Sequence, residues 1–374
     1  MLVAIRVDSS IKMGTGHVMR CLTLAEELRQ KQAKVVFISR AHVGNLNSLI
    51  VQKGFEVYQL VSSESAPLNQ KLVQFNSFGM IDADICYEDW LGVSWEEDAN
   101  QTVSIIEKLC PDWLVVDHYA IDYRWESQLK PFCGKLMAID DLADRNHMCD
   151  LLLDQTYGRE LRDYESHVPL NTILMLGAQF SLLRSEFREW REVSLKRRVH
   201  PEFQQLIITM GGADPDNVTG DVLKTLKNGV LPCDVRLLVI MGESAPWLNE
   251  VSDQLQQMTN PTELKVGVNN MAELMTYSDL AIGAAGSTVW ERCCLGLPSI
   301  MYTLAKNQED IAKKIQLAGA AFFGGSVNEV KSSLAQSVAH MSDVKVLEGF
   351  VNESKMITDG CGVTRVSEML ICEQ

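Results

Sequence analysis

The sequence predicts an α/β protein built from two doubly wound domains of parallel strands. Short apolar runs alternate along the chain with segments whose apolar residues recur at helical spacing, which is typical of strand–helix–strand units. The alternation stops once, in a highly charged stretch near residue 190, and then begins again. The length of 374 residues suits two domains, and the hydrophobic fraction of 46% is enough for large cores.

The first half of the chain contains a series of short apolar runs that we expect to be strands. These runs are Val3–Val7, Val35–Ile38, Trp113–Asp117, Leu136–Asp140 and Leu151–Asp154. Between the first two runs, Val18–Leu28 has its apolar residues on one face of a helix. We therefore expect an N-terminal domain over residues 1–190.

The charged stretch Arg184–His200 divides the two halves. Nine of its 17 residues are Arg, Lys or Glu, a composition that is poor for a core segment and good for a connector. The apolar runs then resume, with a helix expected at Asp214–Asn228. The later strands are expected at Leu206–Met210, Val235–Ile240, Leu264–Val266, Leu280–Ile282 and Ser299–Met301. A second domain over residues 200–345 follows, and residues 346–374 are expected to be helical and to pack back on the first domain.

Charge and cysteine content exclude several classes of protein. The net charge of −15 argues against coating nucleic acid or an anionic membrane, since both need basic surface. The ten cysteines include no Cys-x-x-Cys pair, so we expect neither a metal nor a redox centre, nor any other cofactor. The chain shows no apolar run of membrane-spanning length and no signal-peptide pattern at Met1–Asp8, so we expect a cytoplasmic protein without membrane insertion.

Ligands of open parallel sheets bind beyond the carboxyl ends of the strands, so polar residues at those ends are the candidate site residues. In the first half these are Asp8, Asp117–Tyr119 and Asp140–Asp141. In the second half they are the small-residue turns Gly211–Gly212 and Gly283–Thr288.

The strongest local pattern is the turn after the first strand, with Gly14, Gly16 and His17. Glycine allows a tight backbone path and the close approach of a ligand. A helix that begins near Gly16 presents free N–H groups to an anion and favours a neutral imidazole in its first turn. His17 is therefore a candidate general base; the alternative is that it only caps or packs.

A second turn, Gly283–Thr288, leads into a helix that carries Glu291. Its small residues would let a diphosphate approach the backbone, and the hydroxyls of Ser287 and Thr288 add donors. Glu291 could accept hydrogen bonds from the two hydroxyls of a ribose, or it could be a solvated helix residue. The turn at Gly212 could line the same cleft or only form a corner. Asp140–Asp141 could be a metal pair, but no neighbouring ligand set completes it, so we expect these carboxylates to act in hydrogen bonding or helix capping.

Several longer motifs carry a specific resemblance. The chain resembles the nucleotide-sugar hydrolases of pseudaminic acid biosynthesis, which remove UDP from UDP-2,4-diacetamido-2,4,6-trideoxy-β-L-altropyranose. The matching motifs are Arg6–Cys21, Val116–Tyr119, Ile139–Arg145, Leu182–Phe187, Thr209–Asp214, Gly286–Arg292 and Asn307–Gln308.

The resemblance implies a glycosyltransferase-B fold, with two Rossmann-like domains facing a cleft, and a metal-independent, inverting hydrolase. It implies that His17 is the proton acceptor and that the C-terminal domain binds the uridine and diphosphate. The substrate-binding residues expected from the motifs are Asp8, Gly14, Gly16, Arg20, Tyr119, Asp140, Gly212, Gly286, Ser287, Thr288, Glu291, Asn307 and Gln308.

The chemistry of such a reaction needs few groups. A diphosphate leaves without a proton, so one base and a cradle of N–H dipoles suffice, unlike the paired carboxylates of most glycosidases. A glycosyltransferase of the same fold and a nucleotide-sugar binding module without turnover remain alternatives. The expected partner is a small UDP-sugar and not nucleic acid; the oligomeric state is left open.

Overall fold

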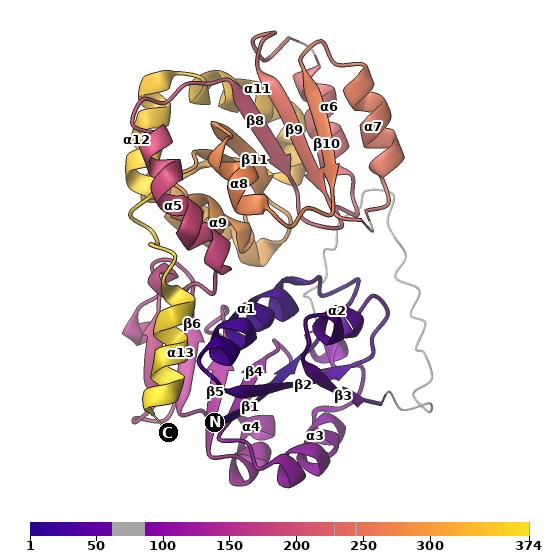
Figure 1. Cartoon of the computed structure of the whole chain (residues 1–374), viewed down its shortest axis with the longest axis vertical. Helices are drawn as coiled ribbons and strands as arrows, with labels where there is room; N and C mark the ends of the chain where they lie inside the picture. The colour runs from indigo at the N-terminus through magenta and orange to yellow at the C-terminus, as the bar shows by residue number, and fades with distance from the viewer. Residues whose placement is uncertain (62–86, 228, 244, 374) are drawn as a thin grey trace. The chain divides into compact units, whose positions relative to one another are not determined.

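The computed structural model describes residues 1–61, 87–227, 229–243 and 245–373, which form two compact α/β units (Figure 1). Unit 1 comprises Met1–Asp154, Glu160–Met175 and Ser367–Gln374. Unit 2 comprises Gln155–Arg159 and Leu176–Val366. Each unit has one sheet covered by helices, so the predicted class of two Rossmann-like domains is confirmed.

Unit 1 contains a seven-stranded sheet in the order β3-β2-β1-β4-β5-β6-β7. The pairs from β3 to β6 run parallel. The strands are β1 (Leu2–Val7), β2 (Lys34–Arg40), β3 (Glu56–Leu60), β4 (Trp113–Asp117), β5 (Lys135–Ile139), β6 (Leu151–Asp154) and β7 (Ile173–Leu176). The helices are α1 (Gly16–Gln30), α2 (Asn47–Gln52), α3 (Trp95–Leu109) and α4 (Tyr123–Leu129), with 3-10 turns η1 (Tyr87–Trp90), η2 (Lys130–Phe132) and η3 (Leu161–Asp163).

Unit 2 contains a six-stranded parallel sheet in the order β10-β9-β8-β11-β12-β13. Its strands are β8 (Gln205–Thr209), β9 (Arg236–Met241), β10 (Thr262–Val266), β11 (Leu280–Ala284), β12 (Ser299–Thr303) and β13 (Phe322–Ser326). Its helices are α5 (Ser185–Arg197), α6 (Val218–Leu226), α7 (Leu248–Gln256), α8 (Met271–Thr276), α9 (Thr288–Cys294), α10 (Glu309–Leu317), α11 (Val330–Met341) and α12 (Val344–Ser354), with η4 (Ala178–Phe180), η5 (Lys306–Gln308) and η6 (Val327–Glu329).

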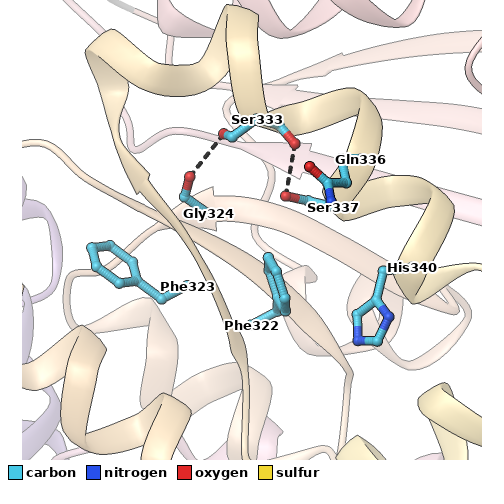
Figure 2. A pocket seen from close by; sticks show the side chains of 7 residues that line it. All are labelled: Phe322, Phe323, Gly324, Ser333, Gln336, Ser337 and His340. Atoms are coloured by element: carbon cyan, nitrogen blue, oxygen red, sulfur yellow. Dashed lines mark hydrogen bonds between the residues drawn. The ribbon is translucent and has the colours of Figure 1, made fainter.

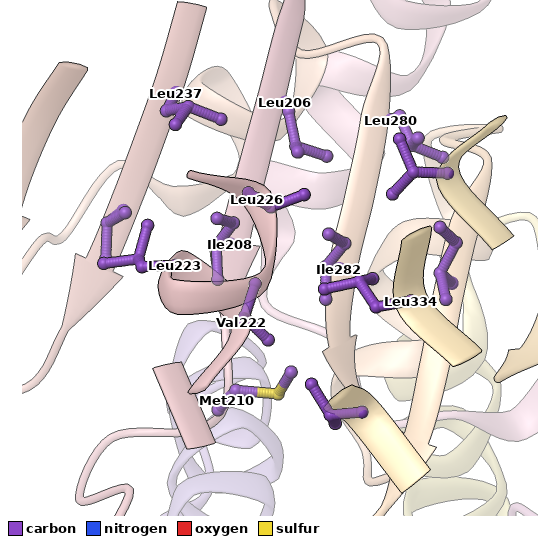
Figure 3. Close-up of a cluster of buried hydrophobic side chains, with 14 of the residues drawn as sticks. Leu206, Ile208, Met210, Val222, Leu223, Leu226, Leu237, Leu280, Ile282 and Leu334 are labelled. Atoms are coloured by element: carbon purple, nitrogen blue, oxygen red, sulfur yellow. The ribbon is translucent and has the colours of Figure 1, made fainter. Parts of the chain in front are cut away.

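The central strands of the unit 2 sheet are buried on both faces, which is why they read as continuous apolar runs. Leu206 and Ile208 of β8 point to the face covered by α6 and α11, together with Leu223 and Leu334 (Figure 3). Ile207 lies between them in sequence and packs in the separate cluster on the opposite face. This alternation follows from the two-residue period of a strand.

The end of the chain is helical. α13 (Gly362–Cys372) follows α12, and the last residues belong to unit 1. There the indole Nε1 of Trp113 donates to the carbonyl of Leu370 at 2.9 Å, and the Lys135 ammonium lies 2.9 Å from the Glu373 carboxylate. α12 instead belongs to unit 2, where Leu347 is fully buried.

The charged stretch near residue 190 is not a connector, as the sequence suggested, but helix α5 of unit 2. Its buried positions are few, with Phe187 and Ser194 on the inner face, so charged side chains fill the rest. Arg198 directly follows α5, and its guanidinium donates to the carbonyls at the end of α8, those of Met275, Thr276 and Ser278. The chain first enters unit 2 at residue 155 and enters it again near residue 176.

Among the described ranges, no helix combines the length and apolarity needed to cross a membrane.

Candidate active site

Each sheet has one point where the strand order reverses, between β1 and β4 in unit 1 and between β8 and β11 in unit 2. Ligands of doubly wound sheets bind beyond the carboxyl ends of the strands at such points. In unit 1 these ends carry Asp8 and Asp117, which lie on neighbouring strands because Val7 pairs with Asp117. In unit 2 they carry Gly211–Gly212 and Gly286. These four positions lie at the reversal point of their own sheet, whereas Asp140 follows β5, and Asn307 and Gln308 lie in η5 after β12.

The turn between β1 and α1 has the backbone that its glycines suggested. Gly14 has a φ of 76°, in the left-handed region, and its N–H donates to the carbonyl of Ser10 at 2.9 Å. α1 begins at Gly16, and its N-cap Thr15 makes no side-chain cap. His17 therefore lies in the first helical turn, beside N–H groups that the helix itself leaves unpaired.

His17 faces a carboxylate from the neighbouring strand. Its Nδ1 lies 2.6 Å from Oδ1 of Asp117, and the residue is 8% exposed. Burial alone would raise the pKa of Asp117, but Arg20 and His17 hold it well below its usual value. An ionised carboxylate at this distance accepts a hydrogen bond from the N–H at Nδ1 of the neutral imidazole, and in that tautomer Nε2 carries no proton. That nitrogen can act as a base.

Arg20 fixes the carboxylate that orients His17. Its guanidinium donates to both oxygens of Asp117 at 2.7 Å and to Asp141 Oδ2 at 2.6 Å. The hydroxyl of Tyr119 also donates to Asp141, at 2.9 Å, and the Tyr119 ring meets the imidazole edge to face at 4.6 Å. Burial raises the pKa of Tyr119 well above its usual value, helped by Asp141. Tyr119 is therefore a neutral phenol beside the imidazole.

Asp8 lies deeper than its place in the sequence suggested. It is 1% exposed, and its carboxylate accepts hydrogen bonds from Arg6 at 2.5 and 2.8 Å and from the N–H of Arg40 at 2.7 Å. The Nε2 of His118 is 3.5 Å away, and burial lowers the pKa of His118 to about 3, so this imidazole is neutral. The Asp8 carboxylate is therefore held by protein groups, and its expected role in substrate binding stays a prediction.

Asp140 is also fully buried, and its partners are protein groups. Its carboxylate contacts Arg145 at 2.8 Å and accepts from the Tyr164 hydroxyl at 2.7 Å and from the N–H of Ala143 at 2.8 Å. Nε2 of His147 lies 3.8 Å from the same carboxylate, and Nδ1 of His147 lies 2.8 Å from Oε1 of Glu126. These contacts are of the hydrogen-bonding kind expected for Asp140–Asp141, and the expected role of Asp140 in substrate binding stays a prediction.

In unit 2 the glycines at the reversal point face open space. A Cβ added at Gly211 or Gly212 would meet nothing within 4 Å, and one at Gly286 would approach only Gln308 Nε2, at 3.8 Å. Gly283, inside β11, differs, because a Cβ there would lie 2.4 Å from the buried Arg292 guanidinium. Packing requires Gly283, whereas the turn glycines leave the backbone accessible.

The start of α9 offers backbone donors. Ala285 N–H donates to the Tyr302 carbonyl and Val289 N–H to that of Gly286, but the N–H groups of Gly286–Thr288 have no acceptor among the described residues. Arg292 holds the turn through the Ala284 carbonyl at 2.9 Å. Such an arrangement suits an anion.

Glu291 lies one turn into α9, where its carboxylate is 3.4 Å from the Arg184 guanidinium. Burial raises its pKa, although Arg184 opposes the shift. Gln308 is held near the turn, since its Oε1 accepts from the Leu304 N–H at 2.9 Å. Asn307 lies in η5, and its side chain falls outside the described part of the chain.

Asp214 follows the Gly211–Gly212 turn and caps a helix. Its two oxygens accept from the N–H groups of Val218 and Thr219, both at 2.9 Å. Asp214 therefore forms the corner between strand and helix, which is one of the two roles expected for this turn. Gly212 itself faces open space, since a Cβ there would meet nothing within 4 Å.

Sequence reasoning missed the residues that orient His17. The sequence indicated Asp117 and Asp141 only as polar residues at strand ends. It did not predict that Asp117 pairs with the His17 imidazole or that Asp141 pairs with Arg20. The available signal was topological: a strand that ends in Asp beside the strand that feeds the histidine turn.

A pocket of about 440 Å³ lies elsewhere in unit 2, between β13 and α11 (Figure 2). Phe322, Phe323 and His340 line it, and the Ser333 hydroxyl donates to the Gly324 carbonyl at 2.8 Å. None of the residues expected from the sequence lines this pocket.

Comparison with known proteins gives matches to both sequence and fold. The glycosyltransferase family 28 C-terminal domain matches residues 204–345. The UDP-2,4-diacetamido-2,4,6-trideoxy-β-L-altropyranose hydrolase of Campylobacter jejuni is 28% identical over 313 residues, covering 83% of this chain and 95% of that protein. The spore coat polysaccharide biosynthesis protein SpsG of Bacillus subtilis is 23% identical, covering 99% and 98%. An uncharacterized protein of Methanocaldococcus jannaschii is 27% identical over 84% of this chain, which spans 59% of that longer protein.

Solved structures show the fold. MurG of Acinetobacter baumannii has a TM-score of 0.68 at 12% identity, with 99% of each chain covered. The UDP-GlcNAc 2-epimerase of Neisseria meningitidis, bound to UDP-GlcNAc, has a TM-score of 0.59 at 11% identity, covering 100% of this chain and 99% of that one. The chain has the glycosyltransferase-B fold, and its sequence relatives include a nucleotide-sugar enzyme.

Proposed function

We propose that this protein hydrolyses UDP-2,4-diacetamido-2,4,6-trideoxy-β-L-altropyranose to UDP and the free sugar, in pseudaminic acid biosynthesis. The observation that supports this most directly is the His17–Asp117 pair, 2.6 Å apart at the strand-order reversal of unit 1. The choice of substrate rests on the motifs and on the similarity to the Campylobacter jejuni hydrolase.

In the proposed reaction, Nε2 of His17 takes a proton from water, and the oxygen attacks C1 of the sugar as the bond to the β-phosphate oxygen breaks. The leaving UDP keeps that electron pair and needs no proton. Attack opposite the leaving group inverts the anomeric configuration. One base is therefore enough, and Asp117 stabilises the imidazolium that forms.

Unit 2 supplies the proposed UDP site. The unpaired N–H groups of Gly286–Thr288 suit the diphosphate, and the open backbone at Gly212 lets it approach. Glu291 would accept from the ribose hydroxyls, and Asn307 and Gln308 belong to the same proposed site. The proposal thus assigns UDP binding to residues of unit 2 and the catalytic base, His17, to unit 1.

A glycosyltransferase is the second candidate, favoured by the match of residues 204–345 to a glycosyltransferase domain. An acceptor hydroxyl would then replace water at His17. The two functions differ in their products, because only the hydrolase releases free sugar when no acceptor is present.

We also propose a cytoplasmic location. All nine cysteines among the described residues are free, as expected for a chain in a reducing compartment.

The test is incubation of the purified full chain with the UDP-sugar and no acceptor, followed by NMR. We expect UDP and free sugar, released first as the inverted anomer. His17→Asn should lower turnover by about 10²–10⁴-fold and leave UDP binding within twofold. Exposed His200 provides the matched control, and His200→Asn should behave as wild type. Turnover only with an added acceptor would favour the transferase, and unchanged turnover in His17→Asn would refute the assigned base.

A further inference from the structure

Arg184 contacts Glu291 of the proposed nucleotide site. It precedes α5 directly, and its side chain is 31% exposed. The guanidinium lies over the fully buried Phe187 ring, 5.1 Å from its centroid, and contacts Glu186 Oε1 at 2.8 Å. The other end, Nη2, reaches Glu291 Oε1 at 3.4 Å. Arg184 thus has a rigid platform on α5 and one long contact to α9.

The contacts of Glu291 leave part of its carboxylate available. Oε1 accepts the Arg184 contact, whereas Oε2 has no hydrogen-bond partner among the described residues. The side chain is 17% exposed. A long contact to one oxygen orients the carboxylate and still permits it to accept from a ligand hydroxyl.

Charge explains why a guanidinium is needed here. Glu186 and Glu291 flank Arg184, and burial raises the pKa of both carboxyls while Arg184 opposes the rise. Without the guanidinium, two partly buried carboxylates would face each other, and Glu291 would tend to take up a proton or turn away. A protonated carboxyl is a poorer acceptor for two hydroxyls than an ionised one.

We propose that Arg184 is a positioning residue that holds the Glu291 carboxylate ionised and oriented for the two hydroxyls of a ribose. The inference rests on the proposed UDP site and adds to it a source of sugar selectivity: the site distinguishes a ribonucleotide from one lacking these hydroxyls through Glu291, and Arg184 sets that ability. Arg184 acts through Glu291 and not on the diphosphate.

The experiment compares two probes, UDP and 2′,3′-dideoxyuridine diphosphate, by calorimetry with the full chain. We expect wild type to prefer UDP by tenfold or more, about the value of hydrogen bonds to a charged acceptor. Arg184→Gln should weaken UDP binding about tenfold and leave dideoxy-UDP within twofold, so that the preference disappears. Glu291→Gln should do the same, and the double variant should be no weaker than either single one, since both changes remove one interaction.

Two further variants guard against misfolding. Arg184→Lys keeps the charge and should retain part of the preference for UDP. Arg188→Gln removes an exposed arginine from the same helix and should bind both probes as wild type, with circular dichroism verifying the fold of each variant.

Two outcomes would overturn the inference alone. Equal weakening of both probes in Arg184→Gln would mean that Arg184 contacts the diphosphate, and an unchanged preference would mean that Glu291 needs no positioning. If wild type binds neither probe, the proposed UDP site fails and the inference fails with it.

Discussion

The two units carry different chemical groups at the same position of the same kind of sheet. At the reversal point of unit 1 the chain places carboxylates, imidazoles and guanidinium groups, most of them buried. At the reversal point of unit 2 it places glycine, alanine and serine, with backbone facing open space. A parallel sheet determines where ligands approach, and the residues after each strand determine what happens there.

Burying charged side chains in unit 1 costs their hydration free energy. Arg6, Arg40 and Asp98 are fully buried with Asp8, and they are tolerated because each charge has close partners, such as the 2.6 Å contact between Arg6 and Asp98. Such a network has little freedom to move, and the imidazole beside it is that of His118, whose Nε2 lies 3.5 Å from Asp8. Unit 2 needs no such network, since main-chain N–H groups are already oriented by the turn.

The largest effect expected from this contrast is in Asp117→Asn. Arg20 donates to both oxygens of Asp117, so the new amide would keep its oxygen toward Arg20 and turn its NH₂ toward His17 Nδ1. The proton of the imidazole would move to Nε2, which could no longer act as a base. We expect turnover to fall about 10²–10⁴-fold with UDP affinity unchanged.

The measurement is steady-state hydrolysis beside UDP calorimetry on the same sample. Asp122→Asn, which alters the half-buried N-cap of α4, is the matched control and should retain full turnover. A normal rate in Asp117→Asn would show that orientation of His17 does not depend on this carboxylate.

The second effect concerns pH. Burial alone would lower the pKa of His147, but Glu126 and Asp140 raise it to about 9. Because the folded pKa lies above the unfolded value, near 6.5, the stability from His147 is fully present below about pH 6.5 and is lost as the pH rises through about 9. The full contribution is roughly 3 kcal/mol.

We therefore expect the free energy of unfolding of wild type to fall, relative to His147→Gln, between about pH 6.5 and 9. Urea denaturation at a series of pH values measures the difference, and exposed His200→Gln serves as the control. Parallel curves for wild type and His147→Gln would mean that His147 is neutral in the folded protein.

The central strands could be predicted from sequence, whereas only one of the four edge strands could, β10, expected as Leu264–Val266. β1 and β8 are buried on both faces, so they read as apolar runs. The strands that sequence reasoning missed, β3, β7 and β13, all lie at sheet edges. They have one neighbour each and are largely half-exposed, and β13 contains two glycines, so their patterns are weak.

The candidate site divides in the same way. The turns at Gly14–His17 and Gly286–Thr288 are local, so their glycines could be found directly in the sequence. The pairing of His17 with Asp117 joins residues 100 positions apart and depends on β1 lying beside β4. The depth of Asp8 and Asp140 also depended on partners brought in by folding, such as Arg40 and Tyr164.

The smallest of the expected effects tests the open backbone of unit 2. Gly286→Ala introduces a Cβ that meets no protein atom closer than 3.8 Å, so the chain should fold as before. The same methyl would occupy space that we assign to the diphosphate. We expect UDP affinity to fall about tenfold, equivalent to about 1.4 kcal/mol, with thermal stability unchanged or slightly higher.

Gly349 provides the matched control for Gly286, because it lies in α12 and a Cβ there would also meet nothing within 4 Å. Gly349→Ala should raise the free energy of unfolding by about 0.5–1 kcal/mol, as expected in a helix interior, and leave UDP affinity unchanged. The pair of variants separates a glycine retained for a ligand from one that is not. If Gly286→Ala binds UDP as tightly as Gly349→Ala does, the diphosphate does not approach this turn, and the contrast between the two units would need another explanation.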